Sequence, residues 1–487
     1  MKPFNDKLLF YGGCAVFILL NCLSIWIELW IFPLASVLLL FLYLLIFRVD
    51  ILLYFMAFIT PLSVPLRDGQ INLELSLPSE PIMITVTLLF LFRIIYDLRF
   101  DKKILLHPVS IALYVYFLWL VVTTITSELP MVSFKFLLCR VWFVVPCYFM
   151  VIQLIGKHKK PITAFFTWHA IGVAFVVLST TVRHALRGFS EVSGHWIMSP
   201  FYNDHTAYGA ILAFMLPIAI AFIFLPENKK WMRVLYMVLS AIFVMGLYLS
   251  FSRAAWLGFL GGVGVFCILK LRIKFSWVLI GAVIIGAAGY FFADDILYKM
   301  SKNTQDSSGN LAEHIRSMGN IKTDASNVER LNRWVAAQGM IEERPIVGWG
   351  AGTYQFVYAP FQKNKYKTII STNFGDGGNA HSEYIGPWAE TGTVGMLTVL
   401  ALVVLILYYG ITTYIRSRDT FTRIVAMAMS IALITYYIHG FLNNFLDTDK
   451  LALPYWAAFA VIVVLNTRVR ESEKDEVTVK IKSLAHE

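Results

Sequence analysis

The chain has 487 residues, of which 58% are hydrophobic and 15% are charged, and its mean hydropathy is +0.67. This composition excludes a soluble globular protein and indicates a polytopic membrane protein. The formal net charge of +10 does not indicate nucleic-acid binding, because much of it comes from short basic loops beside apolar runs.

Apolar runs of roughly 17 to 23 residues, the length of a membrane-spanning helix, occur about fourteen times along the chain. The third is short and contains Pro61 and Pro65, so we expect it to be broken or re-entrant. The first two are nearly fused. The sequence therefore predicts an all-α polytopic membrane protein of about 12–14 transmembrane helices. The runs lie near 8–27, 30–47, 51–66, 82–98, 109–127, 134–155, 162–181, 207–225, 231–251, 254–270, 276–293, 392–414, 421–440 and 451–467.

The basic clusters between these runs alternate along the chain, and basic loops stay on the cytoplasmic side. With fourteen spans both termini are cytoplasmic, and so is the charged tail at 468–487. The loops predicted to face outward lie at 67–81, 182–206, 296–384 and 441–450. The basic clusters lie at 99–103, 157–160, 229–233, 270–274, 416–418 and 468–470.

The five cysteines all fall within predicted spans, where a thiol behaves as a small apolar residue. Their spacing indicates neither a disulfide framework nor a zinc site. The first apolar run lacks a small-residue cleavage pattern and is interpreted as an anchor.

Arg253 lies in a short outward turn between the ninth and tenth spans. A guanidinium at headgroup depth presents a planar set of donors suited to two phosphate oxygens. Snorkelling to the membrane interface is the alternative for an arginine at a helix end. The shortness of this turn favours the phosphate-binding interpretation, because Arg253 has little freedom to reach away from the bundle.

Arg330 belongs to a helix that the pattern predicts from Ser326 or Asn327 to about residue 343, where Arg344-Pro345 ends it. An amphipathic helix lying on the membrane surface is the open alternative. The glycines at 348, 350 and 352 do not have the spacing of a dinucleotide-binding motif. They predict instead a turn that folds the loop helix under the next segment.

His381 differs from the other histidines by its context, a glycine-rich approach followed by a polar segment that enters a membrane span. A neutral imidazole near pH 7 can take a proton from an attacking sugar hydroxyl. A structural histidine is the alternative. At the membrane surface, with arginines nearby, His381 suits a reaction on an anionic lipid-linked substrate.

Two further features leave alternatives open. Arg140 lies about six residues inside the sixth span, where it is either a further diphosphate ligand or the partner of an acidic group in the bundle. Asp447 and Asp449 have the spacing of a metal-binding carboxylate pair, but such a pair is frequent by chance, and we predict no metal site.

This set of residues resembles the O-antigen ligase and polymerase family of bacterial polytopic membrane glycosyltransferases. The resemblance covers roughly residues 199 to 465, whereas the N-terminal spans share only their hydrophobicity. It divides the chain into N-terminal transmembrane helices at 1–198, a ligase-like domain at 199–467 and the tail at 468–487. The matching stretches are Phe201 to His205, Ser252-Arg253, Arg330 with Trp334, Pro345 to Gly350, His381, Glu390 to Gly395 and Asn443 to Asp447.

The resemblance implies a periplasmic loop at 296–384 folded over a lateral cavity in the bacterial inner membrane. It implies transfer of a glycan from undecaprenyl diphosphate to a sugar hydroxyl of a glycolipid or saccharide acceptor, with no metal and no cofactor. Arg253 and Arg330, with Arg140 as a further candidate, hold the donor diphosphate, and His381 activates or positions the acceptor hydroxyl. The family more often has Asn after this histidine, where this chain has Ser382.

Three functions fit these observations. A ligase moves a finished glycan to a lipid core, and a polymerase joins lipid-linked repeats by nearly the same chemistry. A flippase or other transporter of lipid-linked oligosaccharides belongs to another class. Transporters tend to have internal repeats and midplane charges, whereas here the distinctive polar residues lie in one long loop and no repeat is evident.

Overall fold

The computed structural model describes residues 6–68, 73–96, 101–156, 158–273, 325–364, 367 and 378–484. The predicted span at 276–293 and the first part of the predicted loop, 296–324, lie outside these residues. The chain divides into two compact units, Met1–Met56 and Ala57–Glu487. This division does not coincide with the boundary at 198/199, which stays a prediction.

The first unit contains α1 (Asp6–Trp26), α2 (Ile31–Phe47) and most of α3 (Val49–Ile59). From Tyr11 onward the side chains of α1 and α2 are mostly apolar on all sides, and most of them are exposed. Ser36 Oγ of α2 donates a hydrogen bond to Asn21 Oδ1 of α1 at 3.1 Å. Such all-round hydrophobicity is typical of helices whose surroundings are the bilayer.

The third apolar run is broken, as its prolines predict. After α3 comes one 3₁₀ turn, η1 (Thr60–Leu62), and then β1 (Val64–Asp68), which pairs antiparallel with β2 (Leu73–Leu77). Pro61 lacks the N–H that a continuing helix needs. The hairpin itself was not predicted, because its alternation of apolar and polar residues is short.

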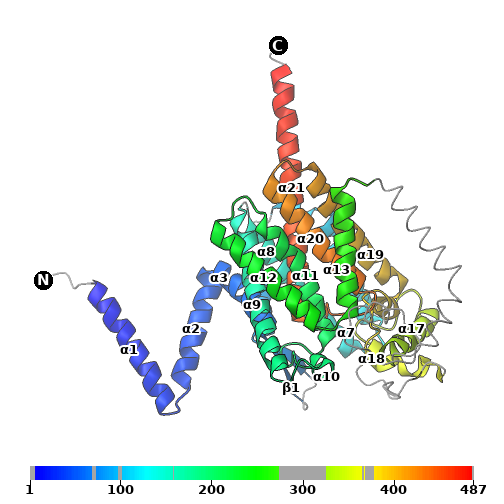
Figure 1. The fold of residues 1–487 in the computed structure, drawn as a ribbon, viewed down its shortest axis with the longest axis horizontal. Coiled ribbons are helices and arrows are strands. Elements are labelled where there is room, and N and C mark those ends of the chain that lie inside the picture. Colours follow the sequence, from blue (N-terminus) through cyan, green and yellow to red (C-terminus); the bar gives the residue numbers. More distant parts are fainter. Residues whose placement is uncertain are drawn as a thin grey trace. The chain divides into compact units, whose positions relative to one another are not determined.

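Ten helices in the described part are long and apolar enough to cross a membrane, and the pair Ile31–Phe47 and Val49–Leu62 adds one more if counted together. The protein is therefore an all-α polytopic membrane protein, as predicted (Figure 1). The ten are α4 (Ser79–Tyr96), α6 (Pro108–Ile125), the continuous α7 (Pro130–Val144), η2 (Val145–Met150) and α8 (Val151–Ile155), α9 (Lys160–Ala185), α11 (His205–Ile223), α12 (Lys230–Leu249), α13 (Arg253–Lys270), α19 (Ile385–Arg416), α20 (Thr420–His439) and α21 (Asp449–Leu484).

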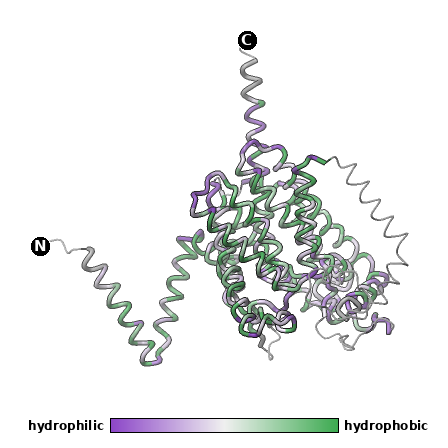
Figure 2. Tube along the Cα trace, in the orientation of Figure 1, coloured by the Kyte–Doolittle hydropathy of each residue, from purple (hydrophilic) through white to green (hydrophobic). Residues whose placement is uncertain are grey.

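The centre of the second unit is formed by α11, α20 and α21, which are the most buried of these helices. Hydrophobic residues predominate along the length of the helices, and hydrophilic residues gather at the helix ends (Figure 2). Helix α13 approaches α20 closely through Gly258 and Gly262. A Cβ atom at these positions would lie 2.5 Å from the Thr435 carbonyl oxygen and 2.4 Å from the Thr435 hydroxyl, respectively. Small residues one turn apart allow such close packing of membrane helices.

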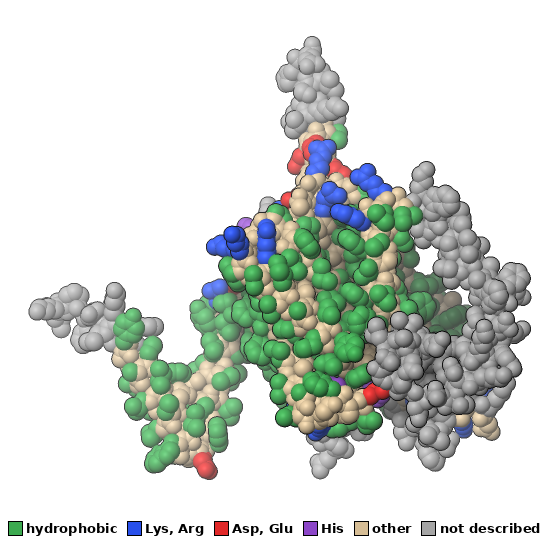
Figure 3. Space-filling view, in the orientation of Figure 1, with side chains coloured by type: hydrophobic (Ala, Val, Ile, Leu, Met, Phe, Trp, Pro, Cys, Tyr) green, Lys and Arg blue, Asp and Glu red, His purple; other side chains and the backbone are tan. Residues whose placement is uncertain are grey.

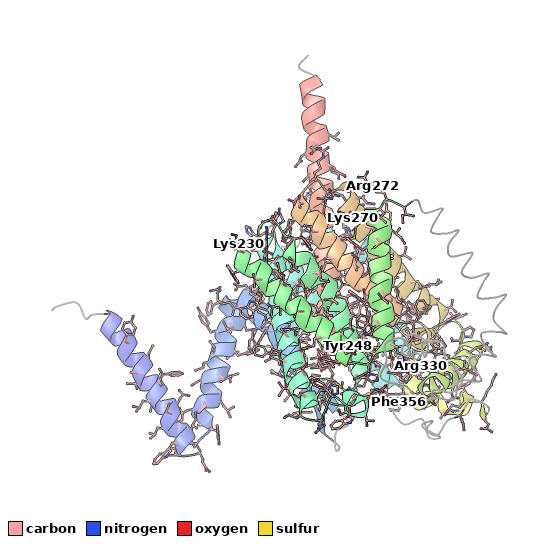
Figure 4. The ribbon with its side chains drawn as sticks, in the orientation of Figure 1. Lys230, Tyr248, Lys270, Arg272, Arg330 and Phe356 are labelled. Carbon is pink, nitrogen blue, oxygen red and sulfur yellow. The ribbon has the colours of Figure 1, made fainter. Side chains whose placement is uncertain are left out.

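The two ends of this bundle differ in charge. Lys and Arg side chains gather at the end from which α21 extends (Figure 3). Lys230, Lys270 and Arg272 lie at this end, whereas Arg330 and Phe356 lie at the other (Figure 4). The tail from residue 468 continues α21 to Leu484, and its side chains at 470–478 are mostly exposed.

Candidate active site

Arg253 is the first residue of α13 and follows a tight turn after α12, as predicted. The turn is fixed on several sides. Ser252 caps α13 by accepting a hydrogen bond from the Ala255 N–H. His205, the first residue of α11, bonds through Nδ1 to the Ser250 carbonyl at 2.9 Å. The guanidinium therefore starts from a rigid backbone at the end of the bundle away from the basic clusters.

Arg330 lies on α17 (Ala325–Glu343), which ends where the sequence predicted. The helix packs its buried side on a small apolar core made by its own loop. Arg330 Nε donates to the Leu442 carbonyl at 3.1 Å, in the turn after α20. Because α17 is folded onto the bundle, these contacts favour a site residue over a helix lying on the membrane surface. The core contains Ala336, Ala337, Met340, Trp349, Tyr354, Tyr358, Ala380 and Ala389.

The glycine-rich turn Pro345–Gly352 packs against a break in α19, which confirms the predicted folding turn. The Gly350 N–H donates to the Glu390 carbonyl at 2.8 Å. Gly392 interrupts the helical dihedral angles with φ 69° and ψ −176°. A Cβ atom there would lie 2.0 Å from the Ile346 carbonyl oxygen, so the close approach requires glycine.

His381 directly follows a segment whose backbone carbonyls accept hydrogen bonds from side chains of α17. Its own φ is 48°, in the left-handed region that histidine adopts more readily than most residues. Its N–H donates to Asn379 Oδ1 at 3.1 Å. Arg333 donates to the Asn379 carbonyl at 2.8 Å, and the Trp334 indole donates to the Ala380 carbonyl at 3.1 Å.

The electrostatic surroundings of His381 keep its ring neutral. Burial, followed by the positive charges of Arg333 and Arg330, lowers the pKa of His381 to about 4. Asp204 and Glu329 act in the opposite direction. At neutral pH the imidazole is therefore a proton acceptor, which is the state that a general base requires.

The predicted residues Arg330, His381 and Arg253 belong to one end of the bundle. The charge of Arg330 acts on His381, and also on the rings of His205 and His439. His205 in turn bonds to the turn that precedes Arg253. Two arginines and a histidine from three separate segments therefore lie at the same end of the bundle, and their joint site stays a prediction.

Arg140 of α7 pairs with an acidic group, which is one of the two alternatives that its sequence position left open. Its guanidinium is buried and lies 2.5 Å from Asp447. It also donates to the Leu446 carbonyl at 2.6 Å. Its role toward a diphosphate stays a prediction.

Asp447 and Asp449 face different partners despite their spacing. Asp447 pairs with Arg140, whereas Asp449 accepts hydrogen bonds from Ser63 at 2.7 Å and from Ser79. Within the described ranges no three His, Cys, Asp or Glu side chains group in a way that could hold a metal ion.

Glu383 organises the site and was not predicted from the sequence. Its Oε1 accepts hydrogen bonds from the N–H groups of Phe445 and Leu446 at 2.8 and 2.9 Å, and from the Tyr436 hydroxyl. Burial raises the pKa of this carboxyl. Its partners lie more than fifty residues away in the chain, so no local pattern could reveal them.

The fold defines a polytopic helical membrane protein, and the predicted residues Arg253, Arg330 and His381 lie at one end of its bundle. Residues 238–400 match the family model described as O-antigen ligase. This match supports a relation to the O-antigen ligase family and a glycosyltransferase activity of the ligase or polymerase type. The segment includes Arg253, Arg330 and His381. No curated protein matches the chain.

Proposed function

We propose that this protein transfers a glycan from undecaprenyl diphosphate to a sugar hydroxyl of a lipid-core acceptor, without a metal ion. The observation that carries the proposal is the neutral His381 beside the charge of Arg330, in a segment that matches the ligase family. We place the reaction at the periplasmic face of the bacterial inner membrane. The gathering of Lys and Arg at the opposite end of the bundle supports this orientation (Figure 3).

The proposed chemistry needs one base and one anion-binding site. His381 takes the proton from the acceptor hydroxyl while that oxygen forms a bond to the anomeric carbon of the donor sugar. The bond between this carbon and the diphosphate oxygen breaks, and undecaprenyl diphosphate leaves with the bonding electrons. Arg253 and Arg330 stabilise the negative charge that develops on the diphosphate. Arg140 is proposed as a further diphosphate ligand, in addition to its pairing with Asp447.

The test is glycan profiling of a deletion strain complemented with variants. Arg253→Ala, Arg330→Ala and His381→Ala are each expected to abolish transfer, because each removes either charge stabilisation or the base. Membrane abundance of each variant is measured in parallel. Matched controls are His158→Ala and Arg418→Ala, which change exposed residues outside the site and are expected to leave the profile unchanged.

The glycan that accumulates separates the related functions. Polymerised glycan on undecaprenyl diphosphate, with no long chains on the lipid core, indicates a ligase. Accumulation of single lipid-linked repeats indicates a polymerase. An unchanged profile in the deletion strain contradicts the proposal, and full activity in any one of the three variants removes that residue from the mechanism.

A further inference from the structure

Helix α17 connects the two parts of the candidate site through a residue that the proposed function does not use. Arg330 and Arg333 lie one turn apart on this helix. Arg333 is buried, with an exposed fraction of 7%. Its Nη1 donates to the Asn379 carbonyl at 2.8 Å, two residues before His381. The helix that carries a proposed diphosphate ligand thereby also holds the backbone of the proposed base.

The guanidinium of Arg333 is fixed on its other sides. Its Nε donates to Glu329 Oε1 at 2.8 Å, in a buried ion pair one turn along the helix. Its Cζ lies 5.5 Å from the centre of the Tyr358 ring, at cation–π distance. A Cβ atom at Gly378 would lie 1.9 Å from Nη1. The guanidinium of Arg333 therefore packs closely against the backbone that precedes His381.

We propose that Arg333 is a positioning residue that fixes the left-handed backbone of His381 and so aims its imidazole at the acceptor hydroxyl. This inference rests on the proposed role of His381 as the base. Arg333 acts through the Asn379 carbonyl, and the neighbouring Trp334 indole holds the Ala380 carbonyl in the same way. In a fixed backbone the imidazole keeps one orientation, and reaction rates depend steeply on such alignment.

The charge of Arg333 gives the inference a second readout. Arg333 and Arg330 both lower the pKa of His381, whereas Asp204 and Glu329 raise it. Removing the Arg333 charge therefore raises the pKa of His381. Because the neutral ring is the active form, the acidic limb of the rate profile moves to higher pH. We expect a shift of about half to one pH unit, the size typical of a nearby charge in a partly screened site.

The experiment compares Arg333→Gln and Arg333→Lys with wild type in proteoliposomes. The probes are undecaprenyl-linked glycan and core glycolipid extracted from the deletion strain. Arg344→Gln is the matched control. Arg344 also has an ion pair, 2.8 Å from Glu128, and also stacks on an aromatic ring, that of Trp349. Unlike Arg333, Arg344 forms its ion pair with Glu128, and the segment before His381 is not its partner in that pair. The double variant Glu329→Gln/Arg333→Gln removes both charges of the buried ion pair, and it is used if the single variant does not fold.

The inference predicts that Arg333→Gln lowers kcat by roughly 10- to 100-fold while the KM for the donor stays within about twofold. The acidic limb shifts upward in Arg333→Gln only, because Arg333→Lys keeps the charge. Arg333→Lys recovers part of kcat because lysine can replace only some of the hydrogen bonds. The double variant shows the same loss of kcat.

Two results overturn the inference. One is a raised donor KM at unchanged kcat, which means that Arg333 binds the donor itself. The other is a kcat and a pH profile equal to those of Arg344→Gln. Failure of the proposed function is a separate outcome, since it is detected by full activity of His381→Ala. If His381→Ala is inactive while Arg333→Gln has the kcat and the pH profile of wild type, only the proposed role of Arg333 is contradicted.

Discussion

At the scale of single residues, the candidate site relies on side chains that hold backbone groups. Glu383 accepts two N–H groups of the turn after α20, and Arg140 donates to the Leu446 carbonyl of the same turn. Arg330 donates to the Leu442 carbonyl. The turn is thereby bound from three elements, so the groups that surround the proposed diphosphate site are fixed before a substrate arrives.

Arg140 and Asp447 allow a test of the two roles that remain for this arginine. If Arg140 mainly holds the turn, Arg140→Gln lowers kcat, and Arg140→Gln/Asp447→Asn is no worse than Arg140→Gln alone, because the two side chains act as one unit. If Arg140 also binds the diphosphate, Arg140→Gln raises the donor KM about tenfold or more while Asp447→Asn stays near wild type. Steady-state kinetics in proteoliposomes, with folding monitored by thermal melting in detergent, distinguish the two.

The sequence predicts the role of a residue when its contacts are local in the chain, and fails when its partners lie far away in the chain. Arg253 and the end of α17 follow from local signals, a short turn between two spans and the Arg344-Pro345 stop. Arg333 depends on the Asn379 carbonyl, which lies 46 residues away in the chain. Glu383 depends on the Phe445 N–H, which lies 62 residues away. No periodic pattern records such contacts. The spacing of Asp447 and Asp449 was similarly uninformative, because the two carboxylates face different partners.

At the scale of elements, the break in α19 at Gly392 determines where α17 sits. The glycine-rich turn enters this break, and the Thr393 N–H donates to the Pro345 carbonyl at 2.8 Å. The sequence predicts the turn and the span separately. The glycines predict a folding turn but not the break in the span that receives it, because this contact requires positive φ angles at Gly348 and Gly392 and the absence of Cβ atoms at both.

Substituting Gly392 by alanine tests this contact. The added Cβ clashes with the Ile346 carbonyl and disfavours the φ of 69°, so we expect a loss of stability of about 1–3 kcal/mol. Activity should also fall, because α17 carries Arg330. The control is Gly264→Ala in α13, where a Cβ meets no atom within 4 Å. Thermal melting in detergent and transfer assays measure both effects; equal behaviour of the two variants contradicts a structural role for the break.

At the scale of the whole molecule, the apolar pattern was sufficient to predict the class of fold, since long spanning helices are a direct consequence of bilayer thickness. The predicted 12–14 spans compare with ten, or eleven with the bent pair, in the described part of the chain. The predicted run at 276–293 lies outside that part. The short β hairpin after Pro61 shows where the pattern fails: a broken run leaves too few residues for periodicity to decide between helix and strand.

The orientation in the membrane follows from the charge difference between the two ends of the bundle and can be tested directly. We expect the end that bears Lys230, Lys270 and Arg272 to be cytoplasmic, because basic loops are retained on that side. In a variant with all five native cysteines replaced, Lys363→Cys should react with a membrane-impermeant maleimide in cells with a permeabilised outer membrane. Arg418→Cys should react only after the inner membrane is opened. Both positions are exposed, so accessibility is set by the membrane alone, and the reverse labelling pattern would place the candidate site in the cytoplasm and contradict a periplasmic transfer.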